Sequence, residues 1–264
     1  MELVEGRTLR ELLQAHGKLP VPRALHIARH VLRALSHAHQ AGIVHRDVKP
    51  DNIILVDQDG DRDFVKLLDF GIAKLIGEAA AEIEDSQLTQ VGTTVGTPKY
   101  MPPEQAFGKS VDQRADLYSL SVVLYMMLAG RPPFDAEEVI DLLMLHASKP
   151  PPSFQEVAPE ANIPEEVSKL VMRGLAKKRD DRFASADEYL AGLEAALDAY
   201  HQRALRPGTS PTPTGETTAG SMVSMPTSST AMSVVGLPSA RFPTWPRPSR
   251  KHWTAIGGAI GVLL

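Results

Sequence analysis

The fold of this chain is decided by a short polar stretch, His45-Arg46-Asp47-Val48-Lys49-Pro50-Asp51-Asn52. Two further motifs follow it in the chain, Asp69-Phe70-Gly71 and Pro102-Pro103-Glu104. The first stretch lies between a segment of helical periodicity and two short apolar runs. Three motifs in this order and at this spacing are far more specific than any one of them alone.

The segments around these motifs predict several helices and one hairpin. The run Thr8-Leu9-Arg10-Glu11 fits a capping box, which predicts a helix start near Thr8. Apolar residues at helical spacing predict a second helix between Pro22 and Gly42. Residues 53–56 and 64–68 are short apolar runs separated by turn residues, which predicts a β-hairpin. We expect further helices over 115–128, 136–146, 165–175 and 185–200, and a long loop over 72–99.

Composition limits the kinds of protein this chain can be. The 264 residues carry a formal charge of −4 and no cysteine, which excludes disulfides and cysteine-based metal sites or nucleophiles. Residues 1–205 hold 23 basic and 31 acidic residues, whereas residues 206–264 hold 5 and 1. The acidic balance of the first part argues against nucleic acid as a partner.

The C-terminal part differs in texture from the rest. Ser, Thr, Pro and Gly supply 28 of the 45 residues over 206–250, which predicts a disordered linker. Basic residues and Trp253 then precede an apolar run that is shorter than the ~20 residues of a membrane span. We therefore expect 251–264 to be the start of a truncated transmembrane helix, with the first part of the chain in the cytoplasm. The alternative is an apolar tail that enters no membrane.

The set of motifs resembles the eukaryotic-like Ser/Thr protein kinases of the bacterial receptor type. The resemblance covers residues 1 to about 200 and implies a kinase domain over 1–205 that holds the hinge and the C-lobe. The implied fold is mainly α (α+β), helical with a small β-hairpin near the active site. The implied activity is transfer of the γ-phosphoryl group of ATP to Ser and Thr hydroxyls of protein substrates, with ATP and Mg²⁺ as cofactors.

The resemblance assigns a role to each polar residue of the motifs. Asp47 is expected to accept the proton of the substrate hydroxyl, and Lys49 to neutralise the phosphoryl group. Lys49 lies two residues after Asp47, so in an extended loop both side chains point the same way. Asn52 and Asp69 are expected to hold Mg²⁺ through oxygen atoms. His45 is expected to be architectural, packed near Phe70 rather than acting as a base.

Other positions are assigned to nucleotide binding and regulation by the same resemblance. The hinge match places Glu2 and Val4 at the purine edge and Leu55 beneath the adenine. Arg46 next to Asp47 is typical of kinases that grip a phosphorylated activation loop. The candidate phosphorylation sites are Thr89, Thr93 and Thr94. Two copies of the chain are expected to associate for phosphorylation in trans. Thr97 is expected at the substrate site.

Three buried positions are expected to support the lobe. Glu104 should pair with Arg182, and Asp116 should anchor the backbone of the catalytic loop. Ser121 stands where the family often has Gly. The histidine pairs His26/His30 and His37/His39 lack an H-E-x-x-H motif, and we interpret them as core or surface residues rather than zinc ligands.

The small lobe of the family has no counterpart in these residues. No G-x-G-x-x-G precedes His45, and the single lysine there, Lys18, is in a predicted loop. We expect the chain to be a fragment that turns over poorly alone. A pseudokinase or scaffold is one alternative, against which the intact Asp47, Asn52 and Asp69 argue. A small-molecule phosphotransferase is another, although Thr97 favours protein substrates.

Overall fold

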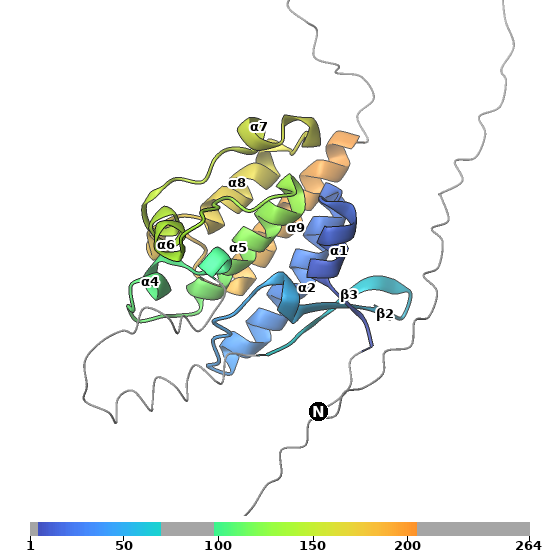
Figure 1. The fold of residues 1–264 in the computed structure, drawn as a ribbon. Helices are drawn as coiled ribbons and strands as arrows, with labels where there is room; N and C mark the ends of the chain where they lie inside the picture. The colour runs from blue at the N-terminus through green and yellow to red at the C-terminus, as the bar shows by residue number, and fades with distance from the viewer. Residues whose placement is uncertain (1–4, 70–97, 205–264) are drawn as a thin grey trace, which may run out of the picture. The chain divides into compact units, whose positions relative to one another are not determined.

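The computed structural model describes residues 5–69 and 98–204 (Figure 1). Its strands are β1 (Arg7–Thr8), β2 (Ile53–Gln58) and β3 (Asp61–Leu67). Its helices are α1 (Leu9–His16), α2 (Val21–Gln40), α4 (Pro103–Ala106), α5 (Arg114–Ala129), α6 (Val139–Ser148), α7 (Phe154–Val157), α8 (Glu165–Gly174) and α9 (Ala186–Ala204). Short 3₁₀ turns cover Pro50–Asn52, Pro98–Tyr100, Pro159–Ala161 and Arg179–Asp181.

The predicted hairpin is present, and its strands run further than the apolar pattern indicated. β2 and β3 pair antiparallel, with Ile53 opposite Leu67 and Gln58 opposite Asp61. The two-residue turn Asp59-Gly60 has positive φ at both positions, 52° and 85°. This left-handed pair matches the twist of the strands, which is why Asp-Gly is a favoured hairpin turn. The two-residue strand β1 joins the other edge of β2, and was too short to predict from alternation.

The helix starts follow from local capping residues. Thr8 Oγ1 accepts from the Glu11 amide at 3.0 Å, and Glu11 Oε2 accepts from the Thr8 amide at 2.9 Å, which is the predicted capping box. At α9, Ser185 Oγ accepts from the Glu188 amide at 3.1 Å, but the Glu188 carboxylate accepts from the Ala184 amide. The Ser185 and Glu188 side chains therefore accept from the amides of Glu188 and Ala184, and the reciprocal pattern of a capping box is only half formed at α9.

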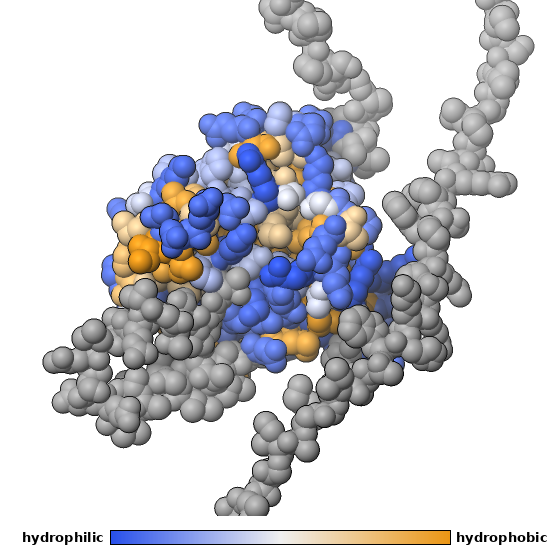
Figure 2. All heavy atoms as spheres, viewed as in Figure 1, coloured by the Kyte–Doolittle hydropathy of each residue, from blue (hydrophilic) through white to orange (hydrophobic). Residues whose placement is uncertain are grey.

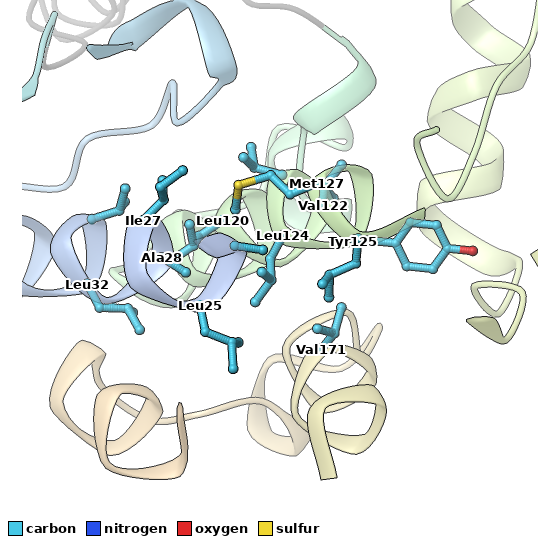
Figure 3. Close-up of a cluster of buried hydrophobic side chains, with 14 of the residues drawn as sticks. Leu25, Ile27, Ala28, Leu32, Leu120, Val122, Leu124, Tyr125, Met127 and Val171 are labelled. Carbon is cyan, nitrogen blue, oxygen red and sulfur yellow. The ribbon is translucent and has the colours of Figure 1, made fainter. Parts of the chain in front are cut away.

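The core is built around α5, which is buried along nearly its whole length as its apolar sequence predicts. α5 contacts α2 and α8, and α9 contacts both α2 and α8. Figure 3 shows side chains of α2 and α5 interleaved, with Val171 of α8 beside them. The β-hairpin packs on α2, so the same helix carries the core on one face and supports the sheet on another (Figure 1).

A close approach of α5 and α8 explains the serine at position 121. A Cβ added to Gly174 would lie 1.9 Å from Ser121 Oγ, so only glycine fits at 174. Ser121 Oγ donates to the Leu117 carbonyl at 2.7 Å and lies 3.0 Å from the Tyr189 hydroxyl. Gly174 thus makes the space that a small residue at 121 would otherwise supply.

The described surface carries several exposed apolar side chains among its polar ones. Figure 2 shows hydrophobic side chains gathered over α6, where Val139, Ile140 and Met144 are exposed. Across 5–69 and 98–204, no helix combines the length and apolar character that a bilayer crossing requires. The loop predicted over 72–99 falls almost wholly outside the described residues, and the linker and membrane segment predicted over 206–264 fall entirely outside them.

Candidate active site

The backbone of the stretch 45–52 is anchored by a buried carboxylate of α5. Asp116 Oδ2 accepts from the His45 amide at 2.8 Å, and Asp116 Oδ1 accepts from the Arg46 amide at 2.7 Å. Arg46 has a positive φ of 62°, a conformation that is unfavourable for a residue with a side chain. The two hydrogen bonds to one carboxylate hold this turn in place, as expected from the sequence.

His39, interpreted from the sequence only as a core or surface residue, completes this anchor. His39 Nε2 donates to Asp116 Oδ2 at 2.8 Å, and the His39 side chain is almost fully buried. His39 and Asp116 are 77 residues apart, so no local pattern could reveal the contact. His39 is a positioning residue, because it orients the carboxylate that holds the loop.

Two polar side chains of the stretch 45–52 converge on Asp47. Lys49 is extended, with φ −153° and ψ 162°, and its Nζ donates to Asp47 Oδ2 at 2.6 Å. Asn52 Nδ2 donates to the Asp47 carbonyl at 2.9 Å and to Asp47 Oδ2 at 3.2 Å. The extended loop therefore turns Asp47 and Lys49 the same way, as the two-residue spacing predicts. Asn52 directs its side-chain nitrogen to Asp47. The side-chain oxygen Oδ1 of Asn52 is therefore the atom able to bind a cation.

His45 joins the stretch 45–52 to the end of the hairpin. Its Nε2 donates to the Leu68 carbonyl at 3.0 Å, and its Nδ1 accepts from the Asp47 amide at 3.3 Å. Burial lowers the pKa of His45, so the ring is neutral and both nitrogens serve the backbone. This geometry suits an architectural residue, whereas Phe70 lies outside the described residues.

The hairpin brings Asn52 and Asp69 to its open end. The amide of Leu68, the residue directly before Asp69, donates to the main-chain carbonyl of Asn52 at 2.9 Å. Asp69 is exposed and has a positive φ of 54°. A second tie, Arg10 Nη2 to Asp51 Oδ2 at 2.7 Å, links α1 to the 3₁₀ turn. This Arg10–Asp51 pair was not predicted, because its members are 41 residues apart.

The position of Leu55 corrects one expectation. Leu55 is 2% exposed and belongs to the hydrophobic core with Ile53 and Val65, so it faces the interior of the lobe. Because side chains alternate along a strand, Ile54 points to the other face. A Cβ added to Gly6 would lie 2.7 Å from Ile54 Cγ2, which puts Ile54 beside the segment that follows the predicted hinge. The strand residue on the hinge side is therefore Ile54.

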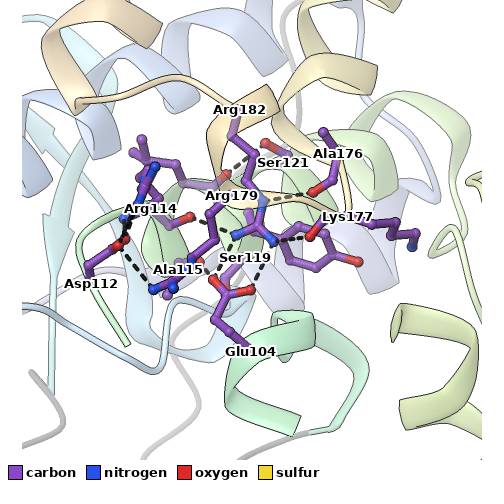
Figure 4. Close-up of polar contacts among 12 residues, drawn as sticks. Glu104, Asp112, Arg114, Ala115, Ser119, Ser121, Ala176, Lys177, Arg179 and Arg182 are labelled. Carbon is purple, nitrogen blue, oxygen red and sulfur yellow. Dashed lines mark hydrogen bonds and ion pairs between the residues drawn. The ribbon is translucent and has the colours of Figure 1, made fainter. Parts of the chain in front are cut away.

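A buried ion pair joins α4 to the segment before α9 (Figure 4). Arg182 donates to both oxygens of Glu104, at 2.7 and 2.9 Å, and both side chains are buried. The rest of the guanidinium donates to the carbonyls of Ala176 at 2.7 Å and Lys177 at 3.1 Å. Nη1 also donates to the Arg114 carbonyl at 3.3 Å, so every N–H of the Arg182 guanidinium has an acceptor, and the ion pair expected from the sequence is present.

Several sequence-predicted site residues lie outside the described part of the chain. They are Glu2, Val4, Thr89, Thr93, Thr94 and Thr97. The structure brings together Asp47, Lys49 and Asn52 and places Asp69 at the end of the same hairpin.

A helical lobe with an acid, a lysine and an asparagine converging before a hairpin that ends in aspartate defines the phosphoryl-transfer class of the kinase fold. The family model described as protein kinase domain matches residues 1–192. The chain therefore belongs to the protein kinase family, and ATP and a divalent metal ion are the cofactors that this membership implies in general.

Several curated relatives of this chain are bacterial kinases. The chain is 40% identical over 195 residues to the serine/threonine-protein kinase pkn3 of Myxococcus xanthus, covering 74% of this chain and 35% of that protein. It is 43% identical over 211 residues to Pkn1 of the same organism, covering 79% and 29%. It is 43% identical over 199 residues to PknH of Mycobacterium bovis, covering 75% and 31%. The chain thus spans about a third of the length of these relatives.

A solved structure supports the fold. The crystal structure of Rad53 1–466 in complex with AMP-PNP aligns with a TM-score of 0.57 and 27% sequence identity. The match covers 72% of this chain and 44% of that one.

Proposed function

We propose that this chain supplies the C-lobe of a Ser/Thr protein kinase that transfers the γ-phosphoryl group of ATP to Ser and Thr hydroxyls of proteins. The observation that carries the proposal is the convergence of Lys49 and Asn52 on the Asp47 carboxylate. The relatives named as serine/threonine-protein kinases support the same assignment.

The proposed mechanism gives each of these side chains one task. The Asp47 carboxylate accepts the proton of the substrate hydroxyl as its oxygen attacks phosphorus. The Lys49 ammonium, held beside Asp47, moves onto the phosphoryl oxygens and neutralises their charge. Asn52 fixes the orientation of Asp47 through its amide nitrogen, so the acid is positioned before the substrate arrives.

The donor set at the end of the hairpin fits a hard divalent cation. The side-chain oxygen Oδ1 of Asn52 and the Asp69 carboxylate are both oxygen ligands, which suits Mg²⁺ better than zinc. Asn52 and Asp69 would hold the ion, which would supply positive charge to neutralise the phosphate oxygens. For adenine, we assign the apolar strand position to Ile54, and the hinge contacts to Glu2 and Val4.

Regulation and location extend the proposal. Arg46, whose backbone is fixed by Asp116, is the residue to grip a phosphorylated threonine at position 89, 93 or 94. Thr97 completes the substrate site, and two copies associate for phosphorylation in trans. The composition of 206–250 and 251–264 supports a disordered linker leading to a single-pass membrane anchor, with the kinase domain in the cytoplasm.

The test is transfer of radiolabelled phosphate from ATP–Mg²⁺ to a protein acceptor. Two preparations are compared: residues 1–264 alone, and the same residues joined to a small lobe of the family with its Gly-rich loop and strand lysine. We expect little transfer by the first and clear labelling of Ser and Thr by the second. Asp47→Asn should lower the rate of the second at least ~100-fold, whereas the exposed control Asp57→Asn should not.

Two results would contradict the proposed activity, and a third would contradict the expected need for a small lobe. Nucleotide binding without Asp47-dependent transfer would favour a pseudokinase or scaffold. Phosphorylation of sugars or antibiotics without that of proteins would favour a small-molecule phosphotransferase. Robust Asp47-dependent transfer by residues 1–264 alone would overturn the expected need for a small lobe.

A further inference from the structure

Two histidines of α2 and one aspartate of β3 meet where the hairpin packs on the helix (Figure 1). His26 Nε2 lies 3.0 Å from both carboxylate oxygens of Asp61, and His30 Nε2 lies 3.3 Å from Asp61 Oδ2. The ligand atoms of all three side chains lie within 4.8 Å of one another. This cluster has no part in the phosphoryl-transfer site described above.

The local structure positions the three side chains firmly. His26 and His30 are one helical turn apart and so share one face of α2. Asp61 is the first residue after the Asp59-Gly60 turn, and its Oδ1 accepts from the Asp63 amide at 3.0 Å. Asp63 itself accepts two hydrogen bonds from Arg23 at 2.8 Å, which ties the start of β3 to α2.

The spacing and chemistry of the cluster fit a metal ion of the zinc class. Metal–ligand distances of ~2.0–2.1 Å in a tetrahedron separate neighbouring ligand atoms by about 3.4 Å, close to the 3.0 and 3.3 Å that separate the two histidine Nε2 atoms from the Asp61 carboxylate. Two imidazoles and one carboxylate suit a borderline transition metal rather than Mg²⁺. We propose that His26, His30 and Asp61 bind Zn²⁺, with water in the fourth position. The side chains are 29%, 12% and 30% exposed, so an ion can reach them.

Arg29 opposes metal binding, because its contact with His26 fixes the tautomer of that ring. Arg29 Nη2 lies 2.9 Å from His26 Nδ1 and can only donate, so Nδ1 accepts and the ring proton resides on Nε2. Metal binding requires a free lone pair on Nε2, so this proton leaves Nε2, Nδ1 becomes the protonated nitrogen and Arg29 turns away. Glu194, 3.8 Å from Arg29 Nη1, is a carboxylate that can receive the displaced guanidinium.

A bound ion would fasten the hairpin to α2. The hairpin carries Asn52 immediately before β2 and Asp69 shortly after β3. The site therefore lies at the turn end of the element whose open end holds the residues assigned to Mg²⁺.

The test uses the untagged 264-residue chain, titrated with Co²⁺ and with Zn²⁺. Co²⁺ should give the intense visible absorption of a tetrahedral nitrogen- and oxygen-ligated ion, and Zn²⁺ should displace it. Excess Zn²⁺ should raise the thermal unfolding midpoint by about 5 °C, and Mg²⁺ should not. His30→Gln and Asp61→Asn should each weaken Co²⁺ binding at least ~100-fold, whereas His37→Gln, an exposed histidine of the same helix, should not.

Arg29→Gln supplies a change in the opposite direction. Glutamine removes a positive charge and can accept a hydrogen bond from Nδ1–H, so Co²⁺ and Zn²⁺ should bind about 10-fold more tightly. This variant and the wild type test the proposal even if His30→Gln or Asp61→Asn fails to fold. Absence of a Co²⁺ spectrum in both would overturn it. Binding that is unchanged in folded His30→Gln and Asp61→Asn would also overturn it, because the ion would then reside elsewhere.

Discussion

Glu104 and Asp116 are both buried carboxylates of the same lobe, but they are neutralised by different means. Glu104 faces a single guanidinium, Arg182, in a two-point ion pair. Among the residues that the structure describes, Asp116 faces no guanidinium and accepts from two backbone amides and from His39. The first arrangement depends on one distant side chain, whereas the second depends on the path of the backbone.

The two arrangements indicate different structural roles for the two carboxylates. A side-chain pair such as Glu104–Arg182 fixes two segments to each other, so its loss should lower the free energy of unfolding of the whole lobe. A carboxylate that binds amides fixes the conformation of a loop, so its loss should loosen the backbone locally, at residues 45–47.

Breaking the ion pair should have the largest effect on stability. Glu104→Ala leaves the Arg182 charge buried and unpaired, and we expect a loss of about 3–5 kcal/mol in the free energy of unfolding measured in urea. Glu166→Ala is the matched control, since its pair with Arg203 is exposed and should contribute under ~1 kcal/mol. Replacing both Glu104 and Arg182 by Met should restore much of the loss. Equal effects of Glu104→Ala and Glu166→Ala would contradict this expectation.

Acid should destabilise the side of the lobe that holds Arg182. The Arg182 guanidinium stacks on the Tyr118 ring, and the Tyr118 hydroxyl lies 2.9 Å from His146 Nδ1. Burial lowers the pKa of His146 to about 4, so between pH 6.5 and 4 the unfolded chain takes up a proton that the folded chain refuses. Stability should therefore fall as the pH falls through this range, by up to about 3 kcal/mol from this group.

The control for His146 is a variant that does not titrate. His146→Asn keeps an acceptor near the position of Nδ1, so the pH-dependent part should vanish. Urea unfolding at pH 7 and pH 4 should show a smaller drop for His146→Asn than for the wild type. Parallel losses in the two proteins would refute this assignment.

Asp116→Asn should have the smallest effect on stability and the most local one. The amide keeps one acceptor but turns an NH₂ group toward a backbone donor or His39, and we expect a loss of about 2 kcal/mol. Hydrogen exchange should rise at the His45 and Arg46 amides and stay unchanged near Glu104. Asp112→Asn, a partly exposed carboxylate just before the same helix, is the control. A uniform rise in exchange across the lobe would count against a loop-specific anchor.

Much of this architecture could be predicted from the sequence because its signals are local. The Thr8 capping box, the Asp-Gly turn and the apolar run of α5 each act within a few residues. Asp47, Lys49 and Asn52 were found together because one extended loop and one 3₁₀ turn hold them.

The contacts that were missed join residues far apart in the chain. His39 reaches Asp116, Arg10 reaches Asp51, and His30 reaches Asp61, each across 31 residues or more. The helical spacing of His26 and His30 was visible, but the partner that makes them a cluster lies on another element. Leu55 was assigned to the wrong face because a strand reverses its side chains at every residue, so a shift of one position exchanges Leu55 and Ile54.

The hairpin also has a consequence for how the lobe folds. Asn52 and Asp69 are joined by a local element closed by a two-residue turn, and such hairpins form in about 1–10 µs. The contacts of Asp116 with His45 and of Glu104 with Arg182 span 71 and 78 residues and carry a larger loop-closure entropy. The oxygen donors can therefore be brought together early in folding, whereas the anchor that positions Asp47 forms only when α5 docks on α2.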